Sequence, residues 1–309
     1  MSPAAPSAEP PVAEPPVAED RPRVPAVPAS SLVLVRPGAG GEISVFTVRR
    51  AGTMAFSAHA TAFPGGRVDP ADDLPDRLWE GTDLADWGRR LGLPHEPVDA
   101  HGTLTELDPA EGAGRVLAAA VRETFEETGV LLARDADTGT PVDPARVAAF
   151  PDELRDAVER HEVDFGELLD REGLRPDAGA LVPWSRWITP HGGPRRYDTF
   201  FFAVHLPQGQ SPERMSSEAA SHGWASPAEL LRRFRAGEVN LMAPTWWQLR
   251  TLVDAGEDVH AGRSRFEPLE GVMLVAGQGP VFPHADEYLR DLTAFRAAAQ
   301  VEESKDNIL

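Results

Sequence analysis

The most informative stretch of the chain is RETFEETGV, residues 122–130. If it is helical, Glu123, Glu126 and Glu127 project from one face of the helix. Like charges at this spacing repel each other weakly, and a bound cation offsets that cost. Clustered carboxylate oxygens suit Mg²⁺ or Mn²⁺ rather than zinc. The pattern therefore indicates a metal site, with a solvated acidic helix face as the alternative.

The flanking residues predict where this helix begins and ends. Asp108 is a candidate N-cap, and Pro109 fits the first turn that follows it. Gly129 is a typical C-terminal stop, because glycine readily adopts the left-handed conformation found there. We therefore predict a helix over residues 109–128, whose opposite side carries an apolar residue at every fourth position and packs on a sheet.

The overall composition excludes several classes of protein. The chain has 309 residues, and 30 Lys and Arg against 49 Asp and Glu leave a formal net charge of −19, which argues against nucleic acid as a partner. There is no cysteine, so disulfides, thiolate metal sites and cysteine nucleophiles are excluded. No apolar run approaches the roughly 18 residues that a membrane helix needs. We expect a cytoplasmic protein without a membrane partner.

The chain divides into a tail, a domain and an extension. Residues 1–28 are rich in proline and are predicted to be a disordered tail. Residues 29–290 are predicted to form one domain, within which residues 73–108 are an insertion of short helical pieces, and residues 291–309 a C-terminal helix or tail. Strands are expected at residues 32–35, 42–50, 60–66, 184–189, 199–206 and 223–225, and further helices at residues 227–236 and 244–255.

Two separated segments together resemble a known family signature. FPGG at residues 63–66, Asp72 and RETFEETGV resemble the Nudix box, G-x5-E-x7-R-E-U-x-E-E-x-G-U, where U is aliphatic. Asp72 stands where the family usually has Glu, and 49 residues rather than seven separate it from Arg122. Such an interrupted box is similar to that of the subgroup related to the peroxisomal coenzyme A diphosphatase.

The resemblance implies a fold and a reaction. The fold would be α/β, a Nudix-type α/β/α sandwich with a mixed sheet, a helical insertion inside the box and a C-terminal extension. The reaction would be Mg²⁺- or Mn²⁺-dependent hydrolysis of a nucleoside diphosphate-linked substrate, with coenzyme A or acyl-CoA as the leading expectation. ADP-ribose, NADH or a dinucleoside polyphosphate are alternatives, as is a non-catalytic nucleotide-binding protein of the same fold. A homodimer is left open.

The resemblance also implies roles for individual residues. The expected metal ligands are Glu123, Glu126 and Glu127. Glu126 or the more distant Glu218 would act as the general base. Arg122 is expected to orient the glutamates by ion pairing, and Asp72 to have a structural role beside it.

Candidates for binding the substrate are weaker. Gly65 and Gly66 would let the loop turn tightly beside the helix. Arg50, at the end of a predicted strand, and Arg195 and Arg196, at a turn before another, could pair with phosphate. Surface charge is the alternative for all three arginines.

Overall fold

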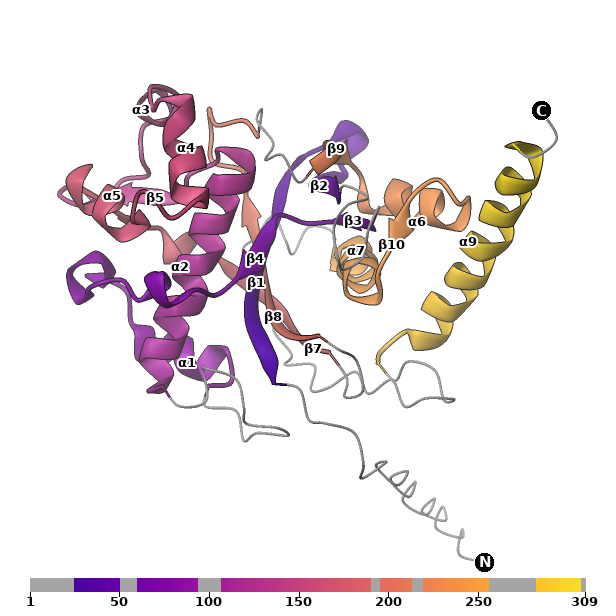
Figure 1. Ribbon diagram of the computed structural model, residues 1–309, viewed down its shortest axis with the longest axis horizontal. Helices are drawn as coiled ribbons and strands as arrows, with labels where there is room; N and C mark the ends of the chain where they lie inside the picture. The colour runs from indigo at the N-terminus through magenta and orange to yellow at the C-terminus, as the bar shows by residue number, and fades with distance from the viewer. Residues whose placement is uncertain are drawn as a thin grey trace, which may run out of the picture.

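The computed structural model describes residues 25–50, 60–93, 107–189, 195–212, 219–255 and 282–306. An eight-stranded mixed sheet lies at its centre, with helices on both faces (Figure 1). The predicted α/β sandwich with a mixed sheet is confirmed. No helix within the described ranges is long and apolar enough to span a membrane.

The sheet is organised around its long first strand. The strands are β1 (Ala26–Pro37), β2 (Ile43–Arg50), β3 (Ala60–Ala62), β4 (Gly65–Arg67), β7 (Val182–Ile188), β8 (Arg196–His205), β9 (Ala219–Ala225) and β10 (Asn240–Leu241), with a separate ribbon of β5 (Ala133–Asp135) and β6 (Leu174–Pro176). β1 runs parallel to β8 and antiparallel to β4 and β2. β2 also pairs with β3 and β9. The first two predicted strands are therefore present and pair as an antiparallel hairpin.

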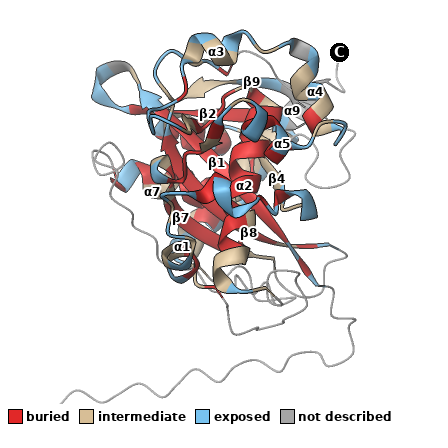
Figure 2. Cartoon of the chain, turned by 90° about the vertical axis from the view of Figure 1, so that its left-hand side faces the viewer, coloured by how far each residue is buried: buried red, intermediate tan, exposed pale blue. Residues whose placement is uncertain are grey.

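The helices form two groups. The helices are α1 (Leu84–Arg90), α2 (Pro109–Thr128), α3 (Pro144–Ala148), α4 (Asp152–Glu159), α5 (Phe165–Arg171), α6 (Pro227–Arg235), α7 (Ala243–Ala255) and α9 (Ala285–Asp306). The first five lie on one side of the sheet and the last three on the other (Figure 1). Leu32 and Leu34 of β1 point into the core beneath α2, whereas Val33 and Val35 point into the opposite core. Because both faces are covered, β1 is buried throughout its centre, from residue 28 to residue 35 (Figure 2).

The helix α2 has the bounds expected from its caps. The Asp108 carboxylate accepts a hydrogen bond from the N–H of Ala110 at 2.9 Å. Gly129 follows with a φ of 75°, and its N–H donates to the Phe125 carbonyl at 2.8 Å. The Ser30 hydroxyl donates to the Val116 carbonyl at 2.7 Å, which ties the middle of the helix to β1.

The described part of the insertion, residues 73–93, is packed into the domain. Trp87 and Leu91 are buried in the same core as α2, and Trp87 meets Phe202 edge to face. The Arg186 guanidinium donates to the Gly92 carbonyl at 3.2 Å, so β7 also holds the end of α1. The expected helical pieces are therefore present as part of the hydrophobic core.

The predicted boundary of the N-terminal tail is wrong by a few residues. β1 begins at Ala26, and Ala26 and Pro28 are paired with Arg196 and Asp198 of β8. A proline lacks a donor but keeps its acceptor, and the Pro28 carbonyl accepts a hydrogen bond from the N–H of Val68. The prolines that indicated disorder are therefore tolerated in this strand. Residues 1–24 lie outside the described ranges.

The C-terminal boundary also moves. α9 begins at Ala285 rather than at residue 291. Its Tyr288 and Phe295 stack on Phe234 of α6, with ring centroids 6.2 Å and 5.2 Å away. The helix is thus joined to the second core through its aromatic residues.

Because Trp87 is buried in the shared core, Trp87→Ala is expected to lower the free energy of unfolding by about 3–5 kcal/mol. Urea denaturation of the full chain measures this loss. Arg89→Ala, on the same helix but with an exposed side chain, is the control and should change stability by less than about 0.5 kcal/mol. Equal stability of the two variants would contradict the packing described for the insertion.

Candidate active site

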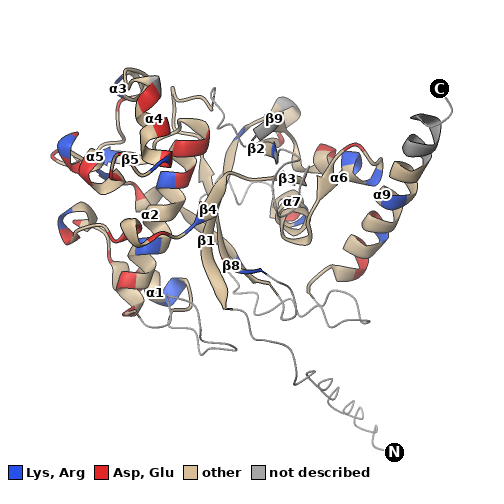
Figure 3. Ribbon diagram, viewed as in Figure 1, with Lys and Arg blue, Asp and Glu red and all other residues tan. Residues whose placement is uncertain are grey.

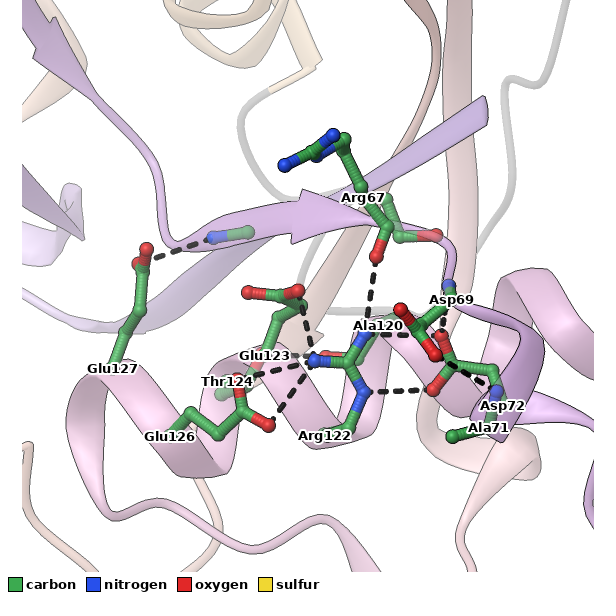
Figure 4. Close-up of polar contacts among 12 residues, drawn as sticks. Arg67, Asp69, Ala71, Asp72, Ala120, Arg122, Glu123, Thr124, Glu126 and Glu127 are labelled. Carbon is green, nitrogen blue, oxygen red and sulfur yellow. Dashed lines mark hydrogen bonds and ion pairs between the residues drawn. The ribbon is translucent and has the colours of Figure 1, made fainter. Parts of the chain in front are cut away.

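A buried arginine lies at the centre of the polar cluster on α2 (Figure 4). The Arg122 guanidinium forms a two-pronged ion pair with Asp72, with Nε–Oδ1 at 2.8 Å and Nη2–Oδ2 at 3.0 Å. Its Nη1 donates to Glu123 at 2.9 Å and to Glu126 at 3.1 Å. Nη2 also donates to the Arg67 carbonyl at 3.0 Å. One side chain therefore fixes two glutamates, the preceding loop and the aspartate.

Asp72 is held in place by its own short turn, the 3-10 helix Pro70–Asp72. The Asp69 carboxylate caps that turn by accepting from the N–H of Ala71 at 2.9 Å, and the N–H of Asp69 donates back to Asp72 at 2.7 Å. The side chain of Asp72 is only 1% exposed. The turn thus places the carboxylate of Asp72, which is shorter than the Glu usual in the family, against the guanidinium of Arg122. The 49 residues between the two positions do not prevent this contact.

The two glycines of the FPGG bend lie against the glutamates. Gly66 has no Cβ where the carboxylate of Glu123 passes, and any larger residue would collide with it. Gly65 has a φ of 149°, and a Cβ there would collide with the backbone of Ser30. The N–H of Gly65 donates to Glu127 at 3.2 Å. The bend and the acidic face of α2 therefore form one continuous site.

The electrostatics of this cluster are unbalanced. Three carboxylates, those of Asp72, Glu123 and Glu126, contact the single guanidinium of Arg122. Burial, with a smaller contribution from Glu126, raises the pKa of Glu123 to about 7 despite the opposing effect of Arg122. Burial also raises the pKa of Glu126. Burial acts to lower the pKa of Arg122, but the surrounding carboxylates raise it above its usual value, so it stays charged.

These residues fit a divalent cation in donor type and in charge. All the donors are carboxylate oxygens, as Mg²⁺ and Mn²⁺ prefer, and a bound cation would favour the charged form of Glu123, whose pKa is raised chiefly by burial. Within the described ranges, no three Asp, Glu or His side chains already converge on one point. Glu127 is bonded to Gly65, and Glu123 and Glu126 to Arg122, so the carboxylates are gathered beside the bend rather than around a common centre.

Comparison with known proteins assigns the chain to a family. The profile of the NUDT19 Nudix domain matches residues 24–252. The chain belongs to the NUDT19 Nudix domain family. Its RETFEETGV helix and FPGG bend are therefore the two halves of a Nudix box, brought together in space.

Individual relatives support this assignment. The acyl-coenzyme A diphosphatase NUDT19 of Gallus gallus is 34% identical over 230 residues, covering 65% of this chain and 59% of the relative. That of Homo sapiens is 29% identical over 305 residues, covering 89% and 80%. A crystal structure of a Nudix hydrolase from Alicyclobacillus acidocaldarius superimposes with a TM-score of 0.57 and 28% identity over 79% of this chain and 99% of that one. The chain thus spans about three fifths of the chicken relative.

The structure does not bring Arg195 and Arg196 to the Nudix box. Arg196 is 4% exposed, and its Nε donates to the Thr189 carbonyl at 2.8 Å, so the prediction of phosphate binding is corrected to a structural role. Arg196 pairs with Ala26 of β1, whereas Gly65 pairs with Ser31. Ala26 and Ser31 are five residues apart, which is about 16 Å along the strand. Arg195 is exposed at the same end of the sheet.

The side chain of Arg50 and the whole of Glu218 lie outside the described ranges, so their roles stay predictions. Sequence reasoning missed Arg67. Its carbonyl is bound by Arg122, and its exposed guanidinium points away from α2 (Figure 4). The available signal was its position directly after the second glycine of the bend.

The charge imbalance is local to the Nudix box. In the view of Figure 3, acidic and basic residues are interspersed over α1, α4 and α5. Exposed ion pairs there, such as Arg77 with Asp170 at 2.9 Å, balance one another. At the Nudix box, by contrast, the three carboxylates of Asp72, Glu123 and Glu126 share the one guanidinium of Arg122.

Asp72→Asn is expected to lower the free energy of unfolding by about 3–5 kcal/mol, because it leaves a buried guanidinium without its strongest partner. Chemical denaturation measures the change. The adjacent Asp73→Asn is the matched control: Asp73 is 53% exposed and pairs with Arg115, so its loss should cost about 1 kcal/mol or less. A similar loss in both variants would contradict the anchoring role of Asp72.

The affinity for Mg²⁺ is expected to depend on pH through Glu123. Its raised pKa stabilises the metal-free protein below about pH 4.5, and that stability is lost as the pH rises through about 7. Because Mg²⁺ must displace the proton, its apparent affinity should rise by up to about tenfold per unit from pH 5 to 7 and then level off. Titration calorimetry in two buffers of different ionisation enthalpy measures the affinity for Mg²⁺ and the number of protons released on binding. A wild-type affinity independent of pH in this range would contradict the assignment, and Glu123→Gln should reduce the slope, leaving the part that comes from the raised pKa of Glu126.

Proposed function

We propose that this protein hydrolyses the diphosphate bridge of coenzyme A or an acyl-CoA with the help of Mg²⁺ or Mn²⁺. The observation that carries the proposal is the contact between the FPGG bend and the acidic face of α2, fixed by the buried Arg122. The names of the chicken and human relatives support the choice of substrate. A cytoplasmic location and a homodimer stay predictions from the sequence.

The reaction is attack by water on one phosphorus of the bridge. One P–O bond of the bridge breaks, two phosphate monoesters form, and a proton is released. For coenzyme A, the products are adenosine 3′,5′-bisphosphate and phosphopantetheine. A divalent ion, when bound, neutralises charge that builds on the phosphate oxygens and lowers the pKa of a bound water.

The residues of the site have two proposed roles, to hold the metal ion and to keep its ligands in position. Glu123, Glu126 and Glu127 would hold the ion, and Arg122 keeps the first two oriented through its hydrogen bonds. The N–H of Gly65 fixes Glu127 at the edge of the site. Because a guanidinium does not release its proton at neutral pH, Arg122 serves here as a positioning residue.

Glu126 is the proposed general base among the described residues. Burial raises its pKa, which makes the carboxylate a better proton acceptor near neutral pH. Glu218 remains the alternative, since it lies in the chain directly before β9. Each assignment is tested by replacing the carboxylate with the amide of the same shape.

Glu127→Gln and Glu126→Gln are expected to lower kcat for coenzyme A by about 10²–10⁴-fold, because each removes a charge that the metal or the proton transfer needs. The released monophosphates are quantified by chromatography with and without Mg²⁺. Glu111→Gln is the control on the same helix: its side chain is 39% exposed and pairs with Arg115, away from the bend.

A panel of coenzyme A, acetyl-CoA, ADP-ribose, NADH and a dinucleoside polyphosphate decides the substrate. We expect the highest kcat/KM for a coenzyme A compound. Preference for another member would reassign the substrate within the Nudix reaction. No product from any of them would favour nucleotide binding without turnover, and full activity of Glu127→Gln would show that the metal assignment is wrong.

A further inference from the structure

Three aromatic side chains form a surface on β2 and β9, which we call the aromatic ledge: Phe46, His222 and Trp224. The Phe46 ring centroid lies 5.7 Å from that of His222 and 5.4 Å from that of Trp224. Phe46 is buried, Trp224 half-buried and His222 exposed. The ledge therefore has a fixed base and an accessible outer ring.

The ledge lies on the same face of the sheet as α2. Phe46 belongs to the core beneath α2, and Val48, two residues on, shares its face. Val48 is paired with His222 on one side and with Ala62 on the other. Residues directly opposite in an antiparallel pair share a face. His222 is thus two strand spacings, about 10 Å, from β3, which leads within three residues to Gly65.

An exposed arginine completes the ledge. The guanidinium carbon of Arg36, at the end of β1, lies 4.1 Å from the centroid of the Trp224 ring. Arg36 is exposed, and among the described residues no ion pair with an acid competes with this ring contact. The ring positions the guanidinium, and its donors can meet a phosphate.

We propose that the aromatic ledge and Arg36 bind the adenosine end of the substrate, with the base stacked on His222 and the phosphate on the ribose paired with Arg36. This inference rests on the proposed function and adds to it the direction in which the substrate lies. An aromatic ring beside an exposed cation matches a purine beside a phosphate. The pantetheine arm has neither an aromatic ring nor a negative charge and would leave Arg36 unused.

Equilibrium binding tests this directly with the full chain and without turnover. Adenosine 3′,5′-bisphosphate and AMP differ only in the phosphate at the 3′ position, and both are titrated by calorimetry. Arg36→Gln is expected to weaken binding of the bisphosphate tenfold or more and to leave AMP unchanged. His222→Ala is expected to weaken both ligands to a similar degree, because it removes the stacking surface.

A matched control is available on the opposite end of the domain. Arg90 of α1 also lies over a ring, 4.0 Å from the centroid of Trp87, but beside the N-terminal half of α2. Arg90→Gln breaks the same kind of contact and should leave both affinities unchanged. Thermal unfolding of each variant verifies that it is folded.

The outcomes separate the two proposals. If coenzyme A is not hydrolysed but Arg36→Gln selectively weakens the bisphosphate, the proposed function fails and the ledge stands. If hydrolysis is normal and neither Arg36→Gln nor His222→Ala changes binding, the ledge is overturned and the function stands. An effect of Arg36→Gln on AMP equal to that on the bisphosphate would also overturn the phosphate assignment. If His222→Ala instead raised KM for coenzyme A and not for ADP-ribose, that result would place the pantetheine arm on the ledge. It would overturn the assignment of the adenine base to His222.

Discussion

The ion pair between Arg122 and Asp72 is the contact on which the rest of the site depends. It joins α2 to the loop that precedes the insertion, through two hydrogen bonds of 2.8 Å and 3.0 Å. The same guanidinium then has one nitrogen left for Glu123 and Glu126. Burying such a pair costs desolvation energy, so its value here is geometric: it sets the positions of the acids that follow it on the helix.

That arrangement leaves the acidic face short of positive charge. Arg122 is shared by several carboxylates, and Glu123, which lies against Gly66, has its pKa raised to about 7 chiefly by burial. A cation entering the site would restore the charged form of this group. The glycines of the bend make this possible, because a side chain at Gly66 would occupy the space taken by the carboxylate of Glu123.

Features set by local sequence could be predicted, whereas features set by distant partners could not. The bounds of α2 followed from Asp108 and Gly129, whose effects reach only the adjacent turn. The start of β1 at Ala26 depends on parallel pairing with β8, about 170 residues away in the chain. The local prolines instead indicated a disordered tail up to residue 28. Arg196 looked like a turn residue available to phosphate, but it is buried by that same pairing. The ledge was missed because its rings come from separate strands.

The insertion interrupts the Nudix box in sequence but leaves it intact in space. Asp72 and Arg122 flank the interruption, and their ion pair closes the intervening residues into a loop. The entropy cost of closure grows only with the logarithm of loop length, so a long insertion costs little more than a short one. Gly88 of α1 packs against Pro109, about 21 Å along the helix axis from Glu123. The described residues of the insertion therefore enlarge the core at one end of α2, and the ion pair between Asp72 and Arg122 still forms.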